Sequence, residues 1–211
     1  EGYLAAAAEH ARNAGALYIA DEVQVGFGRV GDAFWGFQLH DVVPDIVVLG
    51  KPMGNGHPMG AVVTTPEIAD AFDNGMEFFS TFGGNPVSSA CGMAVLDVIE
   101  RESLQEHAGR LGHRLMDGAR KLGDIHPAIG DVRGHGLFLG LDLVLDRSAR
   151  TPDPDTAARV VRTMADHGVL LSTDGPHSNV IKIKPPMVLQ ESDIDMTLRL
   201  LDSALARCTP A

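Results

Sequence analysis

Two residues that could do chemistry together each close an apolar run of the sequence. Asp21 follows the apolar residues of "LYIADE", 17–22, and Lys51 ends "IVVLGK", 46–51. Such runs are typical of buried parallel strands, whose carboxyl ends open into a crevice at one edge of the sheet. Burial penalises an ammonium, so we expect the Lys51 amine to be a nucleophile suited to Schiff-base chemistry. Asp21 would hold the proton on the ring nitrogen of a pyridoxal cofactor, which withdraws electrons when protonated.

An acid at a strand end also fits the metal-holding strand of a nucleotide hydrolase. That class needs a G-x-x-x-x-G-K-[ST] loop to wrap phosphates and place a hydroxyl on Mg²⁺. The nearest match is "DIVVLGKPMGNG", 45–56, where Asp45 replaces the first glycine and Pro52 replaces the hydroxyl residue. The sequence therefore disfavours a nucleotide hydrolase. Taken alone, Lys51 would more often be a surface lysine at a strand end, and only its combination with Asp21 and "GNGHP" favours the cofactor role.

Composition narrows the classes of partner. The 211 residues include 17 Lys and Arg against 28 Asp and Glu, and the net charge of −11 argues against a nucleic-acid partner. Cys91 and Cys208 are far apart and fit neither a disulfide framework nor a zinc site, so we expect a reducing, cytoplasmic location and no metal. No apolar stretch approaches the roughly 20 residues that span a bilayer, so no membrane partner is expected.

Apolar periodicity and turn residues predict the elements that must position Asp21 and Lys51. Helices are expected at 5–13, 66–72, 86–100, 103–122, 156–167 and 191–206. Strands are expected at 17–23, 46–51, 60–65, within 129–144 as an antiparallel pair, and in "GVLLST" and "NVIKIKP". The stretch 26–45 is expected to be an irregular connection, and 78–86 a strand end and loop.

These elements predict an α/β protein with two parts. Residues 1–102 are expected to form the C-terminal portion of a large domain with a mostly parallel sheet, and residues 103–211 a smaller α+β domain. The chain starts without Met on what resembles an amphipathic helix, so we expect a fragment of a longer enzyme.

Three stretches together carry a family resemblance: "ADEVQVGFGRVG", "DIVVLGKPMGNGHPMGAVV" and "STFGGNP". They resemble the class III aminotransferases, pyridoxal-phosphate enzymes of fold type I, in the same order and over essentially the whole chain. The resemblance implies that Lys51 is the Schiff-base lysine and Asp21 the partner of the ring nitrogen. It further implies that Val23 packs under the ring and that Gln24 lies near the phenolic oxygen.

The loop "STFGGNP", 80–86, carries hydroxyls and glycines whose backbone N–H groups can form an anion-binding nest. In the resembled family, a hydroxyl of this loop reaches the cofactor phosphate of the other subunit. Thr81 takes that role here, with Ser80 a weaker candidate, so we expect a homodimer with shared active sites. Family members are about twice this length, so cofactor binding by this piece alone is an open question.

Substrate contacts are expected from two basic residues. Arg29 either anchors its loop or touches the substrate. Lys182 and Lys184 in "NVIKIKPPM", 179–187, alternate onto one strand face, where two ammonium groups suit a phosphate. This region resembles the phospho-lyases of ethanolamine phosphate and phosphohydroxylysine, although a solvated strand face is the alternative. Glu22 is either a substrate-side group or an ion-pair partner.

Three functions therefore compete for this chain. The first is an aminotransferase acting on a small-molecule amine, and the second is a phospho-lyase acting on a phosphorylated amino alcohol. The third is a catalytically silent fragment that keeps the motifs by descent. The first two share the roles given to Lys51 and Asp21.

Overall fold

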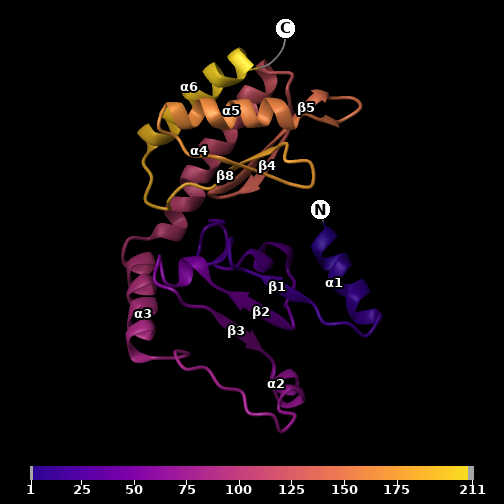
Figure 1. Ribbon diagram of the computed structural model, residues 1–211, viewed down its shortest axis with the longest axis vertical. Coiled ribbons are helices and arrows are strands. Elements are labelled where there is room, and N and C mark those ends of the chain that lie inside the picture. Colours follow the sequence, from indigo (N-terminus) through magenta and orange to yellow (C-terminus); the bar gives the residue numbers. More distant parts are fainter. Residues whose placement is uncertain (1, 209–211) are drawn as a thin grey trace. The chain divides into compact units, whose positions relative to one another are not determined.

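The computed structural model describes residues 2–208, and the chain divides into two compact units (Figure 1). The first unit contains the residues up to Gly28 and Ala33–Gln105, and the second contains Arg29–Asp32 and the residues from Glu106 onward. The sequence predicted a domain boundary near residue 102 but did not predict that residues 29–32 belong to the second unit. The backbone explains this membership, because Leu137 N donates to Arg29 O at 3.0 Å.

Gly31 shows how closely the segment 29–32 lies against the second unit. Its φ is 78°, and a Cβ at this position would come within 2.4 Å of the Cα of Gly109. A residue with a side chain would be strained by the positive φ and would also clash with the backbone of a helix. Glycine is therefore required for the contact that holds 29–32 in the second unit.

The first unit is built on a three-stranded sheet in the order β1 (Ile19–Asp21), β2 (Ile46–Leu49), β3 (Ala61–Thr64). β1 and β2 are parallel, as predicted, but β3 is antiparallel to β2. The predicted strand at 17–23 is only three residues long. β2 is half-buried along its length, and Val62 and Val63 of β3 are exposed.

The helices of the first unit begin and end at residues that explain their bounds. α1 (Tyr3–Asn13) ends before Gly15, whose φ is 76°, and α2 (Pro66–Phe72) starts on a proline at N1, as predicted. α3 (Pro86–Arg101) begins after the N-cap Asn85, whose side chain accepts from Ser88 N at 2.9 Å. Two short 3₁₀ helices, η1 (Gly36–His40) and η2 (Lys51–Met53), complete the unit. The strand end expected in 78–86 is wrong, because these residues form a loop leading into α3.

The second unit packs three helices with an antiparallel sheet. The helices are α4 (Leu104–Ile125), which starts at the end of the first unit, α5 (Pro154–Asp166) and α6 (Glu191–Cys208). The sheet runs in the order β4 (Ile129–His135), β5 (Phe138–Asp146), β8 (Val180–Ile183), β7 (Ser172–Asp174), with β6 (Thr151–Pro152) paired to β5. The antiparallel pair expected in 129–144 is confirmed as β4 and β5.

The main core lies in the second unit, where apolar residues of α4, α5 and α6 meet the inner face of the sheet. Leu141 on β5 and Ile181 on β8 are fully buried in it and are paired across the two strands. Among residues 2–208, no helix combines the length and the apolar character needed to cross a bilayer.

Candidate functional site

The carboxyl ends of β1 and β2 bring Asp21 and Lys51 to one edge of the sheet. The parallel register pairs Asp21, the last residue of β1, with Val48, and Lys51 follows the end of β2 after a single glycine. The prediction that an acidic and a basic strand end share one edge is confirmed. This edge of an open α/β sheet is where ligands bind.

Asp21 presents an exposed carboxylate held by its own turn. Its Oδ1 accepts from Val23 N at 3.0 Å, which fixes the side chain against the backbone two residues on. Within the described part of the chain, Oδ2 has no hydrogen-bond partner. The carboxylate is therefore held in one orientation by Val23 N, and its Oδ2 can accept a hydrogen bond from a ligand.

Lys51 occupies a sparsely populated backbone conformation. Its φ is 31°, which is uncommon for a residue with a side chain, and it follows Gly50 in an extended conformation. Such conformations occur often at functional sites, where the surrounding structure enforces them. The expected burial of Lys51 is wrong, because β2 is only half-buried and the lysine side chain is exposed.

Val23 and Gln24 follow Asp21 beside this edge. A Cβ built on Gly50 would lie 3.5 Å from Cγ1 of Val23, so the valine packs directly over the residue that precedes Lys51. Gln24 is half-buried and engaged with the protein. The apolar contact between Val23 and the lysine turn is consistent with the implied position under a flat ring, and the cofactor roles of both residues stay predictions.

Glu22 has neither of the two roles expected from the sequence. Its side chain is buried, at 2% exposure, and its two carboxylate oxygens accept from Gly36 N at 2.8 Å and Phe37 N at 2.9 Å. These are the first N–H groups of η1, which lack partners inside a helix. Glu22 therefore fastens the connection 26–45 to the end of β1. Sequence reasoning missed this role because the partners are backbone groups 14 and 15 residues away.

The loop 80–86 separates its two hydroxyl residues by role. Ser80 Oγ accepts from Gly83 N at 3.0 Å, so this hydroxyl is used to close the turn. Thr81 is exposed beside it. Asn85 supports the turn by donating to Phe82 O at 2.7 Å. This arrangement leaves Thr81 the better placed of the two for a ligand outside the loop.

Arg29 and Lys182, both in the second unit, already have protein partners. Arg29 Nη1 donates to Leu137 O at 3.2 Å and to Pro185 O at 2.7 Å, and burial lowers the pKa of its guanidinium. Lys182 Nζ lies 2.7 Å from Asp174 Oδ2. The hydrogen bond from Lys182, helped by Gly175 N, lowers the pKa of Asp174. Arg29 thus holds its loop against Leu137 and Pro185, and the ammonium of Lys182 is paired with the carboxylate of Asp174.

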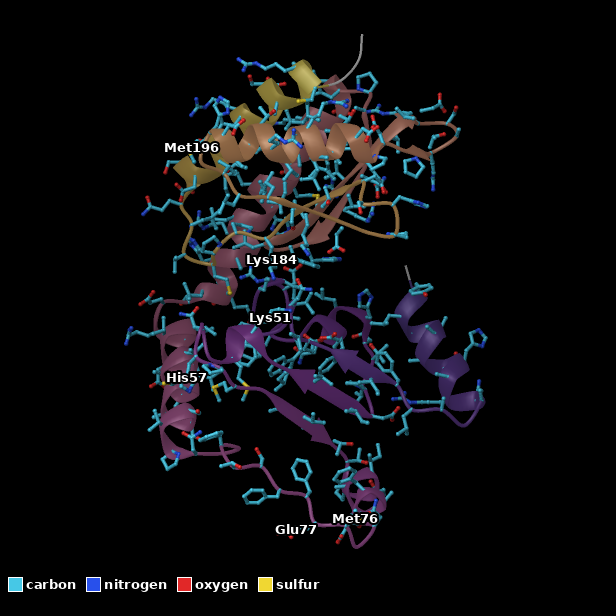
Figure 2. All side chains as sticks on the ribbon, in the orientation of Figure 1. Lys51, His57, Met76, Glu77, Lys184 and Met196 are labelled. Atoms are coloured by element: carbon cyan, nitrogen blue, oxygen red, sulfur yellow. The ribbon has the colours of Figure 1, made fainter. Side chains whose placement is uncertain are left out.

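Strand alternation around Lys182 is as predicted. Ile181 and Ile183 enter the core, whereas Lys182 lies on the opposite face of β8, and Lys184 follows the last residue of the strand. Figure 2 shows Lys184 at the end of this strand. Binding of a phosphate by these two lysines stays a prediction.

His57 was not expected to have a role at the site, and the structure shows a side-chain contact for it. Its Nε2 lies 2.8 Å from Ser88 Oγ on α3, and Figure 2 shows the residue on the side of the turn against that helix. No group of metal-ligating side chains is found within residues 2–208. The position of His57 six residues after Lys51, in a glycine-rich turn closed by Pro58, is the sequence signal that could have identified it.

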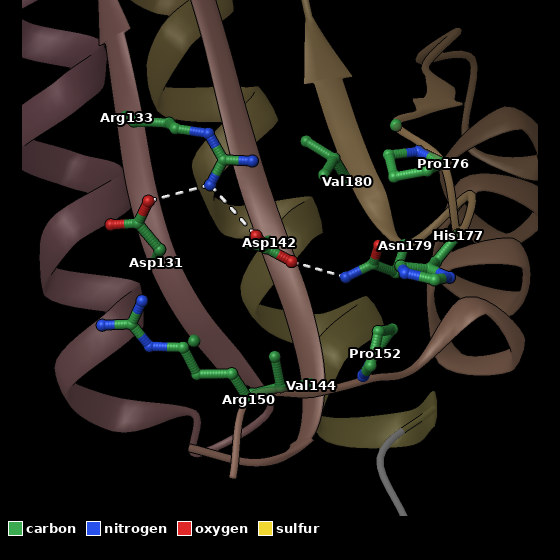
Figure 3. A pocket seen from close by; sticks show the side chains of 12 residues that line it. Asp131, Arg133, Asp142, Val144, Arg150, Pro152, Pro176, His177, Asn179 and Val180 are labelled. Atoms are coloured by element: carbon green, nitrogen blue, oxygen red, sulfur yellow. Dashed lines mark hydrogen bonds and ion pairs between the residues drawn. The ribbon is translucent and has the colours of Figure 1, made fainter. Parts of the chain in front are cut away.

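A pocket of about 600 Å³ in the second unit contains none of the predicted site residues (Figure 3). Arg133 in this pocket bonds to Asp131 at 2.8 Å and to Asp142 at 3.1 Å. Asp142 also accepts from the buried Asn179. Because these polar groups largely satisfy one another, the edge that carries Asp21 and Lys51 is the better candidate site.

The chain is similar to a family model and to several known proteins. The family model described as aminotransferase class-III matches residues 1–205. The chain is 54% identical over 196 residues to "Alanine--glyoxylate aminotransferase 2-like" of Drosophila melanogaster, covering 92% of this chain and 40% of that protein. It is 48% identical over 206 residues to "Ethanolamine-phosphate phospho-lyase homolog 1" of Caenorhabditis elegans, covering 96% and 44%.

Among solved structures, the fold matches a phospholyase from Arthrobacter in complex with phosphoethanolamine. The TM-score is 0.93 with 44% sequence identity, and the match covers 100% of this chain and 50% of that one. The chain thus spans less than half the length of the curated relatives described above. The match over nearly its whole length shows that the chain belongs to the class III aminotransferase family of pyridoxal-phosphate-dependent aminotransferases and phospho-lyases.

Proposed function

We propose that the whole protein is a pyridoxal-phosphate-dependent enzyme in which Lys51 binds the cofactor covalently and Asp21 bonds its ring nitrogen. The observation that supports this is the parallel register of β1 and β2, which brings the amine and the carboxylate to one edge. The residues fit the cofactor in charge and shape. The exposed amine of Lys51 suits an aldehyde, and the exposed carboxylate of Asp21 suits a protonated ring nitrogen. The apolar side chain of Val23, which lies near Gly50, suits a ring face.

Bound pyridoxal phosphate supplies an aldehyde that condenses with amines and a protonated ring that withdraws electrons. The Lys51 amine would hold the cofactor, and the same amine, when free, would act as the base that takes the proton from the substrate Cα. Asp21 keeps the proton on the ring nitrogen, and its bond from Val23 N fixes its orientation. Gln24 and Thr81 are proposed to bond the phenolic oxygen and the phosphate, Thr81 from the partner of a homodimer.

Of the two reactions open to such a site, we favour elimination of phosphate from a phosphorylated amino alcohol. The support is the 44% identity and TM-score of 0.93 to a phospholyase whose structure contains phosphoethanolamine. After Lys51 takes the proton, the bond from the neighbouring carbon to the phosphate oxygen breaks, and phosphate leaves with the electron pair. Transamination is the second candidate, supported by the 54% identity to the aminotransferase 2-like relative.

Lys182 gives the elimination only limited support. Its ammonium is already paired with Asp174, so a substrate phosphate would have to compete with that carboxylate. If the phosphate nevertheless binds there, Lys182→Ala raises KM for a phosphorylated substrate and leaves KM for an unphosphorylated amine unchanged. Arg29 is proposed to shape the loop rather than to touch the substrate. A cytoplasmic location stays a prediction from the cysteine content.

The discriminating experiment uses the whole protein saturated with pyridoxal phosphate. One reaction contains phosphoethanolamine alone, and the other contains an ω-amino acid with a keto-acid acceptor. We expect release of inorganic phosphate in the first reaction. Amino-group transfer without phosphate release would leave the aminotransferase standing. A protein that binds no cofactor and catalyses neither reaction would be the silent fragment.

A further inference from the structure

His57 lies at the far end of a rigid turn that starts at Lys51. Three successive backbone hydrogen bonds close this turn: Met53 N to Gly50 O at 3.0 Å, Asn55 N to Pro52 O at 3.2 Å and His57 N to Gly54 O at 3.0 Å. His57 and the backbone of Lys51 are therefore the two ends of one hydrogen-bonded turn. His57 Nε2 in turn lies 2.8 Å from Ser88 Oγ on α3.

A second contact holds the same turn against α3. Gly92 lies four residues after Ser88, on the same face of the helix. A Cβ at Gly92 would lie 3.0 Å from Met59 Cε and 3.7 Å from Met53 O, so the absence of a side chain lets the turn approach the helix. The His57–Ser88 bond is the polar contact of this interface, and the Gly92 contact is its apolar counterpart.

The far side of Ser88 connects to the loop that carries Thr81. Ser88 Oγ lies 2.9 Å from Asn85 Nδ2, which donates to it, and Asn85 Nδ2 also donates to Phe82 O at 2.7 Å. Ser88 Oγ therefore contacts both Asn85 Nδ2, from which it accepts, and His57 Nε2, and the tautomer of His57 decides which of the two side chains donates in the His57–Ser88 bond. The bonds thus run from the Lys51 turn through His57, Ser88 and Asn85 to the residue next to Thr81.

We propose that His57 is a positioning residue that couples the two cofactor sites of the homodimer. The inference rests on the proposed function, in which Lys51 serves its own site and Thr81 serves the phosphate in the partner's site. Within one subunit, the His57–Ser88 bond would then fix the position of the Lys51 turn relative to the loop 80–86 that carries Thr81. Loss of that bond in one subunit weakens pyridoxal phosphate at both sites.

The first test measures the dissociation constant of pyridoxal phosphate for the whole apoprotein. His57→Phe and Ser88→Ala each remove the bond and should raise Kd by about two- to tenfold, the range expected for one hydrogen bond. The double variant should show no further loss beyond that of Ser88→Ala, because Ser88→Ala already removes the bond to His57 together with the bond from Asn85. His57→Gln keeps a polar group that can reach Ser88 and should restore most of the affinity. The control His10→Phe, on the exposed face of α1, should leave Kd unchanged.

The second test isolates the effect on the partner's site in a mixed dimer. One subunit carries Lys51→Ala together with His57→Phe, and the other is wild type with a different tag. Borohydride then labels only the wild-type Lys51, and labelling is followed against cofactor concentration. Compared with a mixed dimer carrying Lys51→Ala alone, we expect half-maximal labelling to need about two- to tenfold more cofactor.

The outcomes separate this inference from the proposed function. Wild-type protein that is never labelled at Lys51 would refute the proposed function, and the coupling with it. Labelled wild-type protein with identical curves in the two mixed dimers would refute the coupling alone. If His57→Phe does not fold, Ser88→Ala in the same mixed dimer tests the bond from its other end.

Discussion

Replacing Arg29 with methionine separates a structural role of this residue from a substrate-binding role. Methionine keeps an unbranched apolar side chain but removes the donor that serves Leu137 O at 3.2 Å and Pro185 O at 2.7 Å. These bonds join Arg29 to Leu137, the residue before β5, and to Pro185, two residues after the end of β8. The variant therefore tests what keeps the segment Arg29–Asp32 in the second unit.

The magnitude follows from the two bonds. A hydrogen bond from a charged donor contributes about 1.5–3 kcal/mol, and the lower end is a minimum here because Leu137 is fully buried and its carbonyl cannot regain water. Two such bonds give a loss of at least about 3 kcal/mol in the free energy of unfolding. Burial lowers the pKa of Arg29, but the guanidinium stays charged at neutral pH, so both bonds are present under assay conditions.

The assay combines urea denaturation of the whole apoprotein with hydrogen–deuterium exchange of the peptide that contains Leu137. We expect a lower denaturation midpoint and faster exchange at Leu137, whose N–H donates to Arg29 O. Arg101→Met is the matched control, because Arg101 forms an exposed ion pair with Glu102, and such pairs contribute little to stability. An unchanged midpoint together with a raised KM would refute the structural role and establish Arg29 as a substrate contact.

Three further predictions concern Asp21, Lys182 and Leu141. Asp21→Asn should leave the melting temperature unchanged but reduce turnover by about a hundredfold or more, because an amide cannot hold the proton on the ring nitrogen; full activity would contradict this role. Lys182→Ala should raise the pKa of Asp174 toward 3.8, as followed by carboxyl NMR, because the largest cause of its lowered pKa is removed. The lowered pKa of Asp174 stabilises the folded state above about pH 4, and this stabilisation is lost as the pH falls through the folded pKa. The free energy of unfolding of the variant should therefore change less with pH in the acid range than that of the wild type. Leu141→Ala should destabilise the fold by about 2–5 kcal/mol in calorimetry, because Leu141 is fully buried.

Local patterns in the sequence were enough to place the two reactive strand ends. Apolar runs closed by Asp21 and Lys51 predicted parallel strands, and their pairing at one edge is confirmed. The bounds of α2 were also predictable, because Pro66 fixes the first turn of the helix. In both cases the signal lies in the residues of the element itself.

Features that depend on distant partners could not be predicted. The direction of β3 is set by the path of the chain rather than by its four residues, and it is antiparallel to β2. The transfer of Arg29–Asp32 to the second unit depends on Gly109 and Leu137, about 80 and 108 residues away. The pairing of Lys182 with Asp174 likewise needs two strands in register.

The central claim, that Lys51 binds pyridoxal phosphate, is tested most directly by borohydride reduction of the whole protein with the cofactor. Peptide mass spectrometry then locates the reduced adduct. We predict an adduct on Lys51 that disappears in Lys51→Ala while the fold is retained. An adduct on another lysine, or its persistence in Lys51→Ala, would contradict the claim.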